Sequence, residues 1–421
     1  MKKSLLSLVS GIILTLLSTT GPAQFPMYPE TVSMGAGYAD EVYYQFSTSN
    51  TTSVARNIWD ISFRTMIMSS SILTNDGSGV TLWSYPYADT TGWAILDTTG
   101  LSSWTPMYND PTDWENGAFS RNALGGLDFG WAKYNTGTHI LTGDSLFVIQ
   151  LMDGSFKKLW VVEKDSPANT YLFRYANLDG SDFQEMVLDC SLYLDKDFIG
   201  FNMQTNLVVD YQPAKTSWDI LFTKYMSVQP NGEPYPVTGV LTNPVNYTKK
   251  YYPVDSEYND WEVAPWDSSR SNIGWDWKTF SMTTMTYQVN DSMVFYVKDQ
   301  IAEAYRLKFT GFEGSSTGNI DFGKARVFSA GIGDKQQSEI RITLYPNPAT
   351  DVIKIDIEAL KLLNEEVLIT LLDFTGKSIR SERVSSSQQQ ITLNIQSLSP
   401  GVYLLKVTSG NNFSLNKFIK Q

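Results

Sequence analysis

One five-residue pattern occurs twice in this chain, and it constrains the fold more than any other feature. Residues 59–63 read Trp-Asp-Ile-Ser-Phe, and residues 218–222 read Trp-Asp-Ile-Leu-Phe. Large apolar residues alternate with polar or small ones, which predicts a half-buried β-strand with Trp59, Ile61 and Phe63 on one face. The recurrence suggests that a larger unit is duplicated.

Four further short matches follow each pentapeptide in the same order: a Gly-Val pair, an Asp-Trp-Glu, a Gly-Trp and an Asp-Ser. They stand at Gly79-Val80 and Gly239-Val240, Asp113–Glu115 and Asp260–Glu262, Gly130-Trp131 and Gly274-Trp275, and Asp144-Ser145 and Asp291-Ser292. An ordered set of matches predicts two homologous domains, which we place at residues 38–183 and 184–330.

Composition and turn signals favour strands in both copies. Aromatic residues make up 13% of the chain, and such residues pack well on sheets. Aromatic runs such as 42–46 and 171–175 are separated by turn signals such as Asn75–Gly79 and Asn231-Gly232. We therefore predict two tandem antiparallel β domains.

The N-terminus has the features of an export signal. Lys2 and Lys3 precede an apolar run from Leu5 to Leu17 and small residues up to Ala23, which predicts a secretory signal peptide at 1–23. The run is too short to span a bilayer, and no later apolar run is long enough, so no transmembrane segment is expected. No cysteine stands near the cleavage point, so no lipid anchor is expected either.

Charge and cysteine content exclude further classes. The formal net charge is −12; both ends of the chain are slightly basic, so residues 24–340 carry about −16, and this disfavours nucleic acid as a partner. Cys190 is the only cysteine, so no intrachain disulfide can form, and its apolar neighbours favour a buried thiol.

The chain changes character after residue 330. Residues 331–340 are polar and glycine-containing, as in a linker. Residues 341–421 then show short alternating runs, which predict a C-terminal immunoglobulin-like β-sandwich. We expect its strands at 352–357, 367–372, 391–395, 402–407 and 413–419. The predicted fold class of the whole chain is thus all-β.

Several short motifs in this last segment resemble the type A C-terminal sorting domain of the type IX secretion system. The matching residues are Leu344, Tyr345, Pro346, Asn347, Pro348, Ala349, Asp373, Thr375, Gly376, Lys377, Leu398, Pro400, Gly401, Val402, Tyr403, Leu404 and the basic end 417–420. The resemblance implies passage through the type IX machinery across the outer membrane. It also implies removal of the domain, followed by attachment to surface polysaccharide or release.

The duplicated part resembles the HmuY family of surface haemophore-like proteins. The residues that carry this resemblance are the two Trp-Asp-Ile-x-Phe strands, residues 273–278 and residues 308–312. The family implies an all-β fold and haem, or a related porphyrin, held between two axial His or Met side chains. The chain departs from the family in having two copies, a sorting domain and a single histidine.

Haem iron requires an imidazole or thioether on each face within an apolar slot. His139 is the only imidazole, and Met107 or Met152 could complete a His/Met pair with it. Met282 with Met285 or Met293 could instead form a site in the second copy. Methionines at strand spacing are more often core residues, and a lone histidine is more often structural.

Other functions have weaker support in the sequence. One His and one Cys exclude His-rich or Cys-rich zinc sites, and no Gly-x-Ser-x-Gly elbow is present. Asp113 with Glu115, or Asp260 with Glu262, could serve a glycosidase, but turn carboxylates beside a packed Trp explain them better. Residues 75–79 lack the spacing of a calcium loop and are read as a plain turn. The sequence therefore predicts a non-catalytic surface or secreted binding protein for haem, or alternatively for a glycan or protein.

Overall fold

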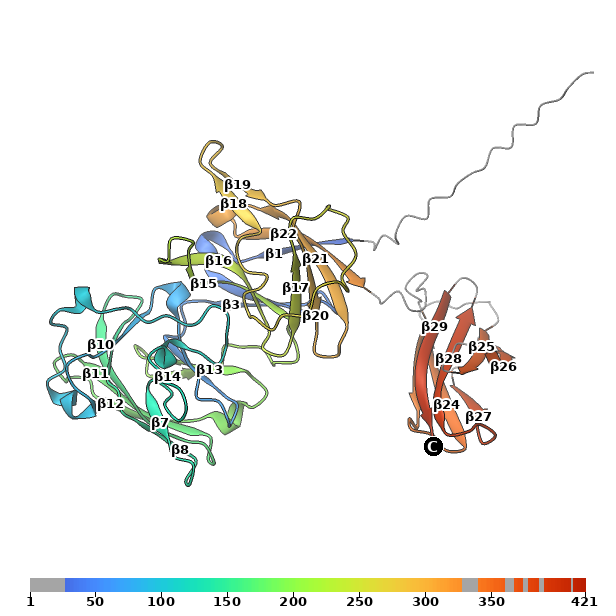
Figure 1. Ribbon diagram of the computed structural model, residues 1–421, viewed down its shortest axis with the longest axis horizontal. Coiled ribbons are helices and arrows are strands. Elements are labelled where there is room, and N and C mark those ends of the chain that lie inside the picture. Colours follow the sequence, from blue (N-terminus) through green and yellow to red (C-terminus); the bar gives the residue numbers. More distant parts are fainter. Residues whose placement is uncertain (1–26, 328–339, 360–366, 374–377, 386–389, 410–411) are drawn as a thin grey trace, which may run out of the picture. The chain divides into compact units, whose positions relative to one another are not determined.

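The structure is a computed structural model of the 421-residue chain. It describes residues 27–327, 340–359, 367–373, 378–385, 390–409 and 412–421 (Figure 1). The chain divides into two compact units, Met1–Val327 and Phe328–Gln421. The predicted signal peptide, and the predicted linker up to residue 339, lie outside the described residues. Within the described residues the ordered elements are β-strands and short 3₁₀ helices, so the all-β prediction is confirmed.

The first unit contains two lobes, each built from two antiparallel sheets. The first lobe has one sheet in the order β14-β13-β4-β5 and a larger sheet in the order β12-β11-β10-β8-β7, in which β9 pairs with β10 and with β6. Its strands are β4 (Ile61–Arg64), β5 (Ile72–Thr74), β6 (Thr81–Ser84), β7 (Ala132–Tyr134), β8 (Ile140–Gly143), β9 (Phe147–Gln150), β10 (Phe156–Asp165), β11 (Thr170–Asn177), β12 (Gln184–Asp189), β13 (Phe198–Asn202) and β14 (Leu207–Val209).

The second lobe repeats this arrangement with strands from both ends of the unit. Its sheets have the orders β16-β15-β2-β3 and β1-β22-β21-β20-β17, with a separate β18-β19 hairpin. Its strands are β1 (Tyr28–Ser33), β2 (Asp40–Tyr44), β3 (Thr51–Ala55), β15 (Ile220–Val228), β16 (Pro234–Thr242), β17 (Tyr247–Tyr251), β18 (Lys278–Ser281), β19 (Thr286–Val289), β20 (Val294–Lys298), β21 (Ala304–Phe312) and β22 (Asn319–Val327).

Seven short 3₁₀ helices connect these strands within residues 27–327. They are η1 (Ala36–Tyr38), η2 (Asp76–Ser78), η3 (Thr90–Ala94), η4 (Leu101–Ser103), η5 (Ala118–Ser120), η6 (Cys190–Tyr193) and η7 (Gly314–Ser316). Cys190, at the start of η6, is buried as predicted. Residues 75–79 form the η2 turn, as the reading of that segment as a turn predicted.

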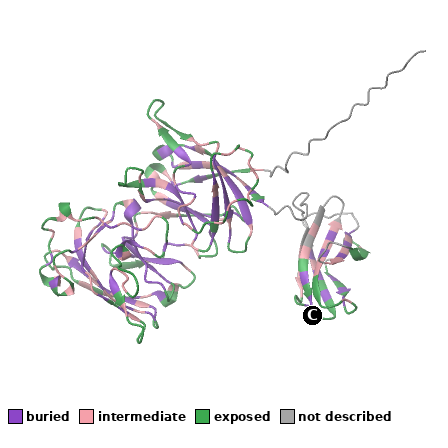
Figure 2. Ribbon diagram, in the orientation of Figure 1, coloured by how far each residue is buried: buried purple, intermediate pink, exposed green. Residues whose placement is uncertain are grey.

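The four sheets stack as layers, and the hydrophobic clusters between them consist of buried residues. Figure 2 colours these buried positions purple along the ribbon. One hydrophobic core lies inside each lobe, and a third cluster of buried side chains lies where the two four-stranded sheets face each other. We call this third cluster the interlobe layer. Its buried members are Tyr43, Trp59, Leu73, Trp114, Phe198, Tyr211, Trp218, Leu221, Tyr225, Val237 and Leu241. Such face-to-face packing of sheets removes both faces of the inner strands from water.

This layering corrects the prediction of a half-buried strand at residues 59–63. All four residues of β4 are buried, because one face meets the core of the first lobe and the other meets the interlobe layer. Ile61 and Phe63 share a core, as expected, but Trp59 precedes the strand and packs in the interlobe layer against Tyr211.

The two sequence copies exchange strands. Strands β1 to β11 and strands β12 to β22 follow the same order, but β2 pairs with β15 and β13 pairs with β4. In the same way, the first strand of each copy pairs with the last strand of the other: β1 pairs with β22, and β12 pairs with β11. The first three strands of each copy therefore complete sheets of the lobe built by the rest of the other copy. The second copy begins at β12, which starts at Gln184, and the first copy begins at β1, before the predicted residue 38.

The pairing also revises the short sequence matches. Ile61 pairs with Thr74 and Ile220 pairs with Thr242, so residues 72–75 (Ile-Leu-Thr-Asn) correspond to residues 240–243 (Val-Leu-Thr-Asn). The two Gly-Val pairs therefore occupy different places: Gly79-Val80 follows Asn75, whereas Gly239-Val240 precedes the equivalent Asn243. The structural counterpart of Trp131 is Trp277, not Trp275. The carbonyl of Trp131 accepts the backbone N–H of Asp144, and the carbonyl of Trp277 accepts that of Asn290. In both cases the donor directly follows the next hairpin, and both tryptophans are buried.

The C-terminal unit is a two-sheet sandwich, as predicted. Its sheets have the orders β23-β24-β27 and β26-β25-β28-β29. The strands are β23 (Ile340–Tyr345), β24 (Val352–Ala359), β25 (Val367–Asp373), β26 (Ser378–Val384), β27 (Gln390–Asn394), β28 (Gly401–Ser409) and β29 (Asn412–Lys420). All five expected strands are present, and β23 and β26 are additional.

The Tyr-Pro-Asn-Pro motif of this unit contacts its last strand. Asn347 Oδ1 accepts the backbone N–H of Ile419 at 2.9 Å, and Asn347 Nδ2 donates to the carbonyl of Lys417 at 3.2 Å. Tyr403 donates from its hydroxyl to the carbonyl of Ser399 and stacks on Phe418. The motif residue Gly376 lies outside the described residues.

Candidate functional site

A cleft of about 870 Å³ opens where the loops of the first lobe meet the β15–β16 end of the second lobe. The first lobe lines it with residues from the segments 84–87 and 103–122, and the second with Met226, Ser227, Val228 and Pro234. Ligand sites in proteins commonly have volumes of roughly 300–1,000 Å³ and lie between lobes or domains. This cleft is therefore the candidate site.

One wall of the cleft is aromatic. Tyr87 and Trp104 meet edge to face with ring centroids 5.8 Å apart, and Tyr85 packs against both rings. Tyr87 is 60% exposed, and its hydroxyl donates to the carbonyl of Thr99 at 3.2 Å. The loop that carries these rings packs on the outer face of the larger sheet through a small core that includes Leu96. Tyr87 is thus held in place while its ring faces solvent.

The other residues of the first lobe add polar groups beside the aromatic wall. Arg121 forms an ion pair with Asp110, with Nη1 2.7 Å from Oδ2. Burial alone would raise the pKa of Asp110, but hydrogen bonds from Thr112 and Arg121 hold that pKa below its usual value. Asn122 lies next to Arg121, with its Nδ2 3.7 Å from the sulfur of Met107. The cleft thus contains a neutralised cation and a carboxamide.

Asn109 lies on the lining and is held by four hydrogen bonds. Its side chain donates to the carbonyl of Thr74 at 2.7 Å and accepts the backbone N–H groups of Thr74 and Ala118, each at 3.1 Å. Its own backbone N–H donates to Asp76 Oδ2 at 3.0 Å. Such a fully bonded group provides a rigid support for the exposed residues around it.

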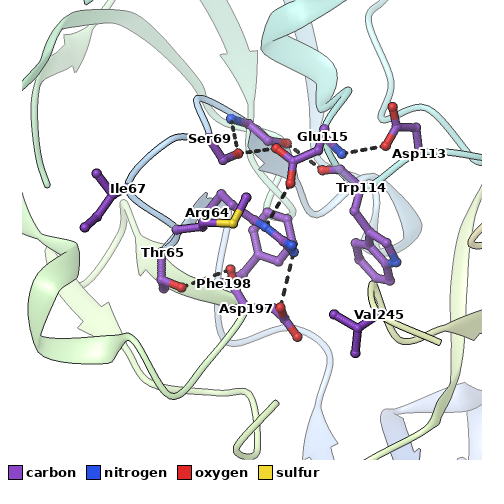
Figure 3. A network of polar contacts seen from close by, with 12 residues as sticks. Arg64, Thr65, Ile67, Ser69, Asp113, Trp114, Glu115, Asp197, Phe198 and Val245 are labelled. Carbon is purple, nitrogen blue, oxygen red and sulfur yellow. Dashed lines mark hydrogen bonds and ion pairs between the residues drawn. The ribbon is translucent and has the colours of Figure 1, made fainter. Parts of the chain in front are cut away.

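A second polar cluster, centred on Arg64, lies on β4 (Figure 3). Arg64 Nε is 3.1 Å from Glu115 Oε1, and Nη1 is 3.4 Å from Asp197 Oδ1. Burial raises the pKa of Asp197, and Arg64 opposes this shift. Ser69 also donates to Glu115. This network joins β4 to two loops, and its carboxylates are occupied by protein partners.

The carboxylates weighed for glycoside hydrolysis do not form equivalent pairs. Asp113 accepts the backbone N–H of Glu115 at 2.9 Å within a turn, and Glu115 is engaged by Arg64. Trp114 packs in the interlobe layer, whereas Trp261 packs on the outer face of the second lobe. The two Asp-Trp-Glu matches therefore lie at different places in the two lobes.

The residues predicted to bind haem are distributed over several places. Met107 is buried in the first-lobe core and also lines the cleft, and Met152 packs on the same core. His139 is exposed at the turn before β8, where its Nδ1 lies 2.6 Å from the hydroxyl of Tyr134. Met282 and Met285 are 77% and 66% exposed in the β18–β19 turn.

His139 and Met285 turn out to be structural counterparts. Each has a positive φ, 61° and 55°, and each donates its backbone N–H to the residue four positions earlier at 2.8 Å. A positive φ in a non-glycine residue is typical of tight turns. No described cavity is lined by both His139 and one of the four methionines.

The sequence reading missed Tyr87, Trp104, Arg121 and Asn122. The available signal was the length of the segment between β6 and β7 (85–131), which exceeds that of the corresponding segment between β17 and β18 (252–277). Among the described residues there is no helix long and apolar enough to cross a membrane, and no cluster of three or more His, Cys, Asp or Glu residues suited to a metal ion.

Comparison with known families identifies the C-terminal unit. The family model of the secretion system C-terminal sorting domain matches residues 343–421. This segment is a type IX secretion sorting domain. Its presence indicates a secreted or cell-surface protein and fits an interaction with that secretion machinery. No curated protein matches the chain.

Three solved structures show distant similarity to this chain. Latent PorU from Porphyromonas gingivalis is 13% identical, with a TM-score of 0.18, over 67% of this chain and 31% of that one. A beta-glucuronidase of Faecalibacterium prausnitzii is 11% identical, with a TM-score of 0.19, over 81% and 45%. Part of the alpha-2-macroglobulin of Escherichia coli is 13% identical, with a TM-score of 0.20, over 74% and 90%. The chain thus spans less than half the length of the first two, and these scores support no conclusion.

Proposed function

We propose that this protein is exported through the type IX system and binds a glycan, without catalysis, in the cleft between its lobes. The observation that carries the proposal is the aromatic wall of exposed Tyr87 and half-buried Trp104 beside Arg121 and Asn122. The ring faces of Tyr and Trp pack well on the C–H faces of sugars, and guanidinium and carboxamide groups hydrogen-bond to hydroxyls.

The size of the cleft and its charge favour a neutral sugar. A volume of about 870 Å³ accommodates a short oligosaccharide. The only charged lining residue is Arg121, and its charge is already balanced by Asp110. An anionic ligand would therefore gain little from this wall.

The composition of the lining supports a binding role. Hydrolysis of a glycosidic bond commonly requires two carboxyl groups flanking it, and no Asp or Glu lines the described cleft. The sorting domain, together with the predicted signal peptide, supports a location at the outer face of the outer membrane or in the medium. Attachment to surface polysaccharide after removal of the sorting domain belongs to the same proposal.

A panel of neutral oligosaccharides, screened on an array and followed by calorimetry, tests this function. We expect binding by the wild-type protein and a loss of up to about tenfold in affinity for Tyr87→Ala, because the contact with an aromatic ring contributes about 0.5–1.5 kcal/mol. Tyr252→Ala is a matched control, since Tyr252 is 57% exposed and lies outside the cleft. Equal binding by all three proteins, or no binding to any neutral glycan, would refute the proposal.

Haem binding stays a prediction from the sequence resemblance. Titration of the protein with haemin, followed by absorbance, tests it directly. A Soret shift that is lost in His139→Ala would support an axial role for His139. A shift that persists in that variant would move attention to Met107, Met152, Met282 and Met285, and no shift would exclude haem.

A further inference from the structure

The η2 turn of the first lobe is wedged against the second lobe directly beside the cleft. A Cβ atom on Gly77 would lie 1.9 Å from the carbonyl oxygen of Lys224, so the backbone of the turn contacts the backbone of β15. Arg56 Nη1 donates to the carbonyl of Gly77 at 2.9 Å from the segment that joins the lobes. The turn is therefore fixed from two sides.

Asp76, the first residue of this turn, bonds to both walls of the cleft. Its Oδ2 accepts the backbone N–H of Asn109, which belongs to the first-lobe wall, at 3.0 Å. The backbone N–H of Met226, which belongs to the second-lobe wall, also favours the charged form of this carboxyl group and lowers its pKa. One buried side chain, 6% exposed, thus joins two backbone segments that come from opposite sides of the cleft.

The second lobe has no equivalent of this contact. Residues 75–80 (Asn-Asp-Gly-Ser-Gly-Val) lead from Asn75 to β6, whereas only Pro244, Val245 and Asn246 separate Asn243 from β17. The turn that carries Asp76 is therefore an extension specific to the lobe with the aromatic wall. A purely structural latch inherited by duplication would be expected in both lobes.

Several charged and titratable groups surround Asp76. Arg270 is buried, lies over the ring of Trp114 with its guanidinium carbon 4.3 Å from the centroid, and attracts the Asp76 carboxylate. Tyr108, on the cleft lining, has its pKa raised first by burial and then by the charge of Asp76. Arg56 and Lys224 flank the turn on the β15 side.

We propose that Asp76 is a positioning residue that fixes the separation of the two walls of the cleft. Asp76 accepts the backbone N–H of Asn109, the N–H of Met226 interacts with the same carboxyl group, and Gly77 beside it packs on the backbone of Lys224. Separation of the walls would therefore weaken these contacts. The step from this spacing to ligand affinity rests on the proposed function. The chemistry is that of charge-assisted hydrogen bonds, which are stronger than neutral ones.

The protonation of Asp76 then tunes the cleft. Burial raises the pKa of Asp76 to about 6, while the hydrogen bond from Asn109 and the charge of Arg270 oppose this. Above this pH the carboxylate holds both N–H groups strongly. Acidification through pH 6 converts it to a weaker acceptor, so the walls loosen and glycan affinity falls.

Hydrogen–deuterium exchange on the full chain tests the positioning role without any ligand. For Asp76→Ala at pH 7.5 we expect exchange of the Asn109 and Met226 amides to accelerate by about tenfold, the equivalent of one lost hydrogen bond. Asp76→Asn keeps an acceptor oxygen and should give a smaller increase. It also provides a variant of the same shape if the alanine variant does not fold. Asp291→Ala, at an exposed carboxylate, is the control.

The outcomes separate the two proposals. Acceleration at both amides supports the positioning role, whether or not the wild-type protein binds a sugar. Unchanged exchange at both amides, or acceleration on one wall only, overturns it. If the wild-type protein binds a glycan, its affinity should fall by about tenfold in Asp76→Ala and should lose its dependence on pH near 6. Exchange that accelerates without any glycan binding would reject the proposed ligand alone.

Discussion

Asp60 and Asp219 occupy equivalent positions in the two lobes, and each accepts a backbone N–H from the other sequence copy. Oδ2 of Asp60 accepts the N–H of Met203 at 2.7 Å, and Oδ2 of Asp219 accepts that of Phe46 at 2.7 Å. Both donors lie just after the first strand of an exchanged hairpin. The aspartate of the repeated Trp-Asp pattern is therefore a latch for strand exchange.

Removal of this latch should destabilise the first unit. In Asp219→Ala the N–H of Phe46 is left buried without an acceptor, so we expect the free energy of unfolding to fall by about 1–3 kcal/mol. Asp219→Asn retains an oxygen and should lose less. Denaturant unfolding monitored by tryptophan fluorescence measures the change, with exposed Asp291→Ala as the control. Equal stability of Asp219→Ala and the control would contradict the latch.

Lys278 should make stability depend on pH. It is buried, it donates to the carbonyl of Thr238 at 2.5 Å, and burial lowers its pKa to about 7. The unfolded lysine keeps its proton up to about pH 10.4, so between pH 7 and 10 the unfolded chain binds more protons than the folded one. Stability therefore rises with pH in this window, by about 3 kcal/mol from this group.

Denaturation of the wild type and of Lys278→Met across pH 7 to 10 measures this contribution. The variant should lack the rise, whereas Lys133→Met, at a lysine side chain that is 69% exposed, should retain it. Parallel pH profiles for the wild type and Lys278→Met would show that Lys278 keeps its charge in the fold.

A single methyl group at Gly77 should disturb the contact between the lobes. In Gly77→Ala the new Cβ would lie 1.9 Å from the Lys224 oxygen, and the backbone on both sides would have to move. We expect a loss of about 1–3 kcal/mol in the free energy of unfolding, the usual range for overpacking. Gly137→Ala, where the nearest atom is a side-chain oxygen at 3.3 Å, is the matched control in a calorimetric melt. Equal melting temperatures would argue against the close contact.

Asn347 should be required for an intact sorting domain. Its side chain bonds to the backbone of β29 as both donor and acceptor, so Asn347→Ala removes two hydrogen bonds worth about 0.5–1.5 kcal/mol each. We expect less protein at the cell surface and in the medium and more in the periplasm, measured by fractionation and immunoblotting. Ser397→Ala, at an exposed position of the same sandwich, should be exported normally. Normal export of Asn347→Ala would show that the hydrogen bonds of Asn347 to β29 are not required for secretion.

The sequence was sufficient for the fold class and for the duplication, because alternation and turn residues are local signals. The strands of the sorting domain were predicted from the same local signals, and the structure confirms them. The exchange of hairpins could not be predicted, since alternation tells which residues of β4 or β15 share a face but not which hairpin lies beside the strand. Both faces of β4 are buried, so hydrophobicity alone could not show that Ile61 lies in the first-lobe core and Trp59 in the interlobe layer.

The candidate site could be predicted even less. The residue types that can bind haem iron pointed to His139 and Met285, but both residues lie in tight turns and have a positive φ. The cleft depends on where a long irregular loop lies against the far lobe. Tyr87 and Trp104 are distant in sequence from Met226, and the packing of the two lobes, including η2 on β15, brings them to one cleft.

The crossed hairpins have a consequence for dividing the chain. Each lobe takes strands from both sequence copies, so a cut between β11 and β12 leaves neither fragment with all the strands of a lobe. To rebuild the architecture seen here, the two fragments must associate and insert their first three strands into each other. Residues 27–327 are thus one folding unit, although their sequence is a tandem repeat.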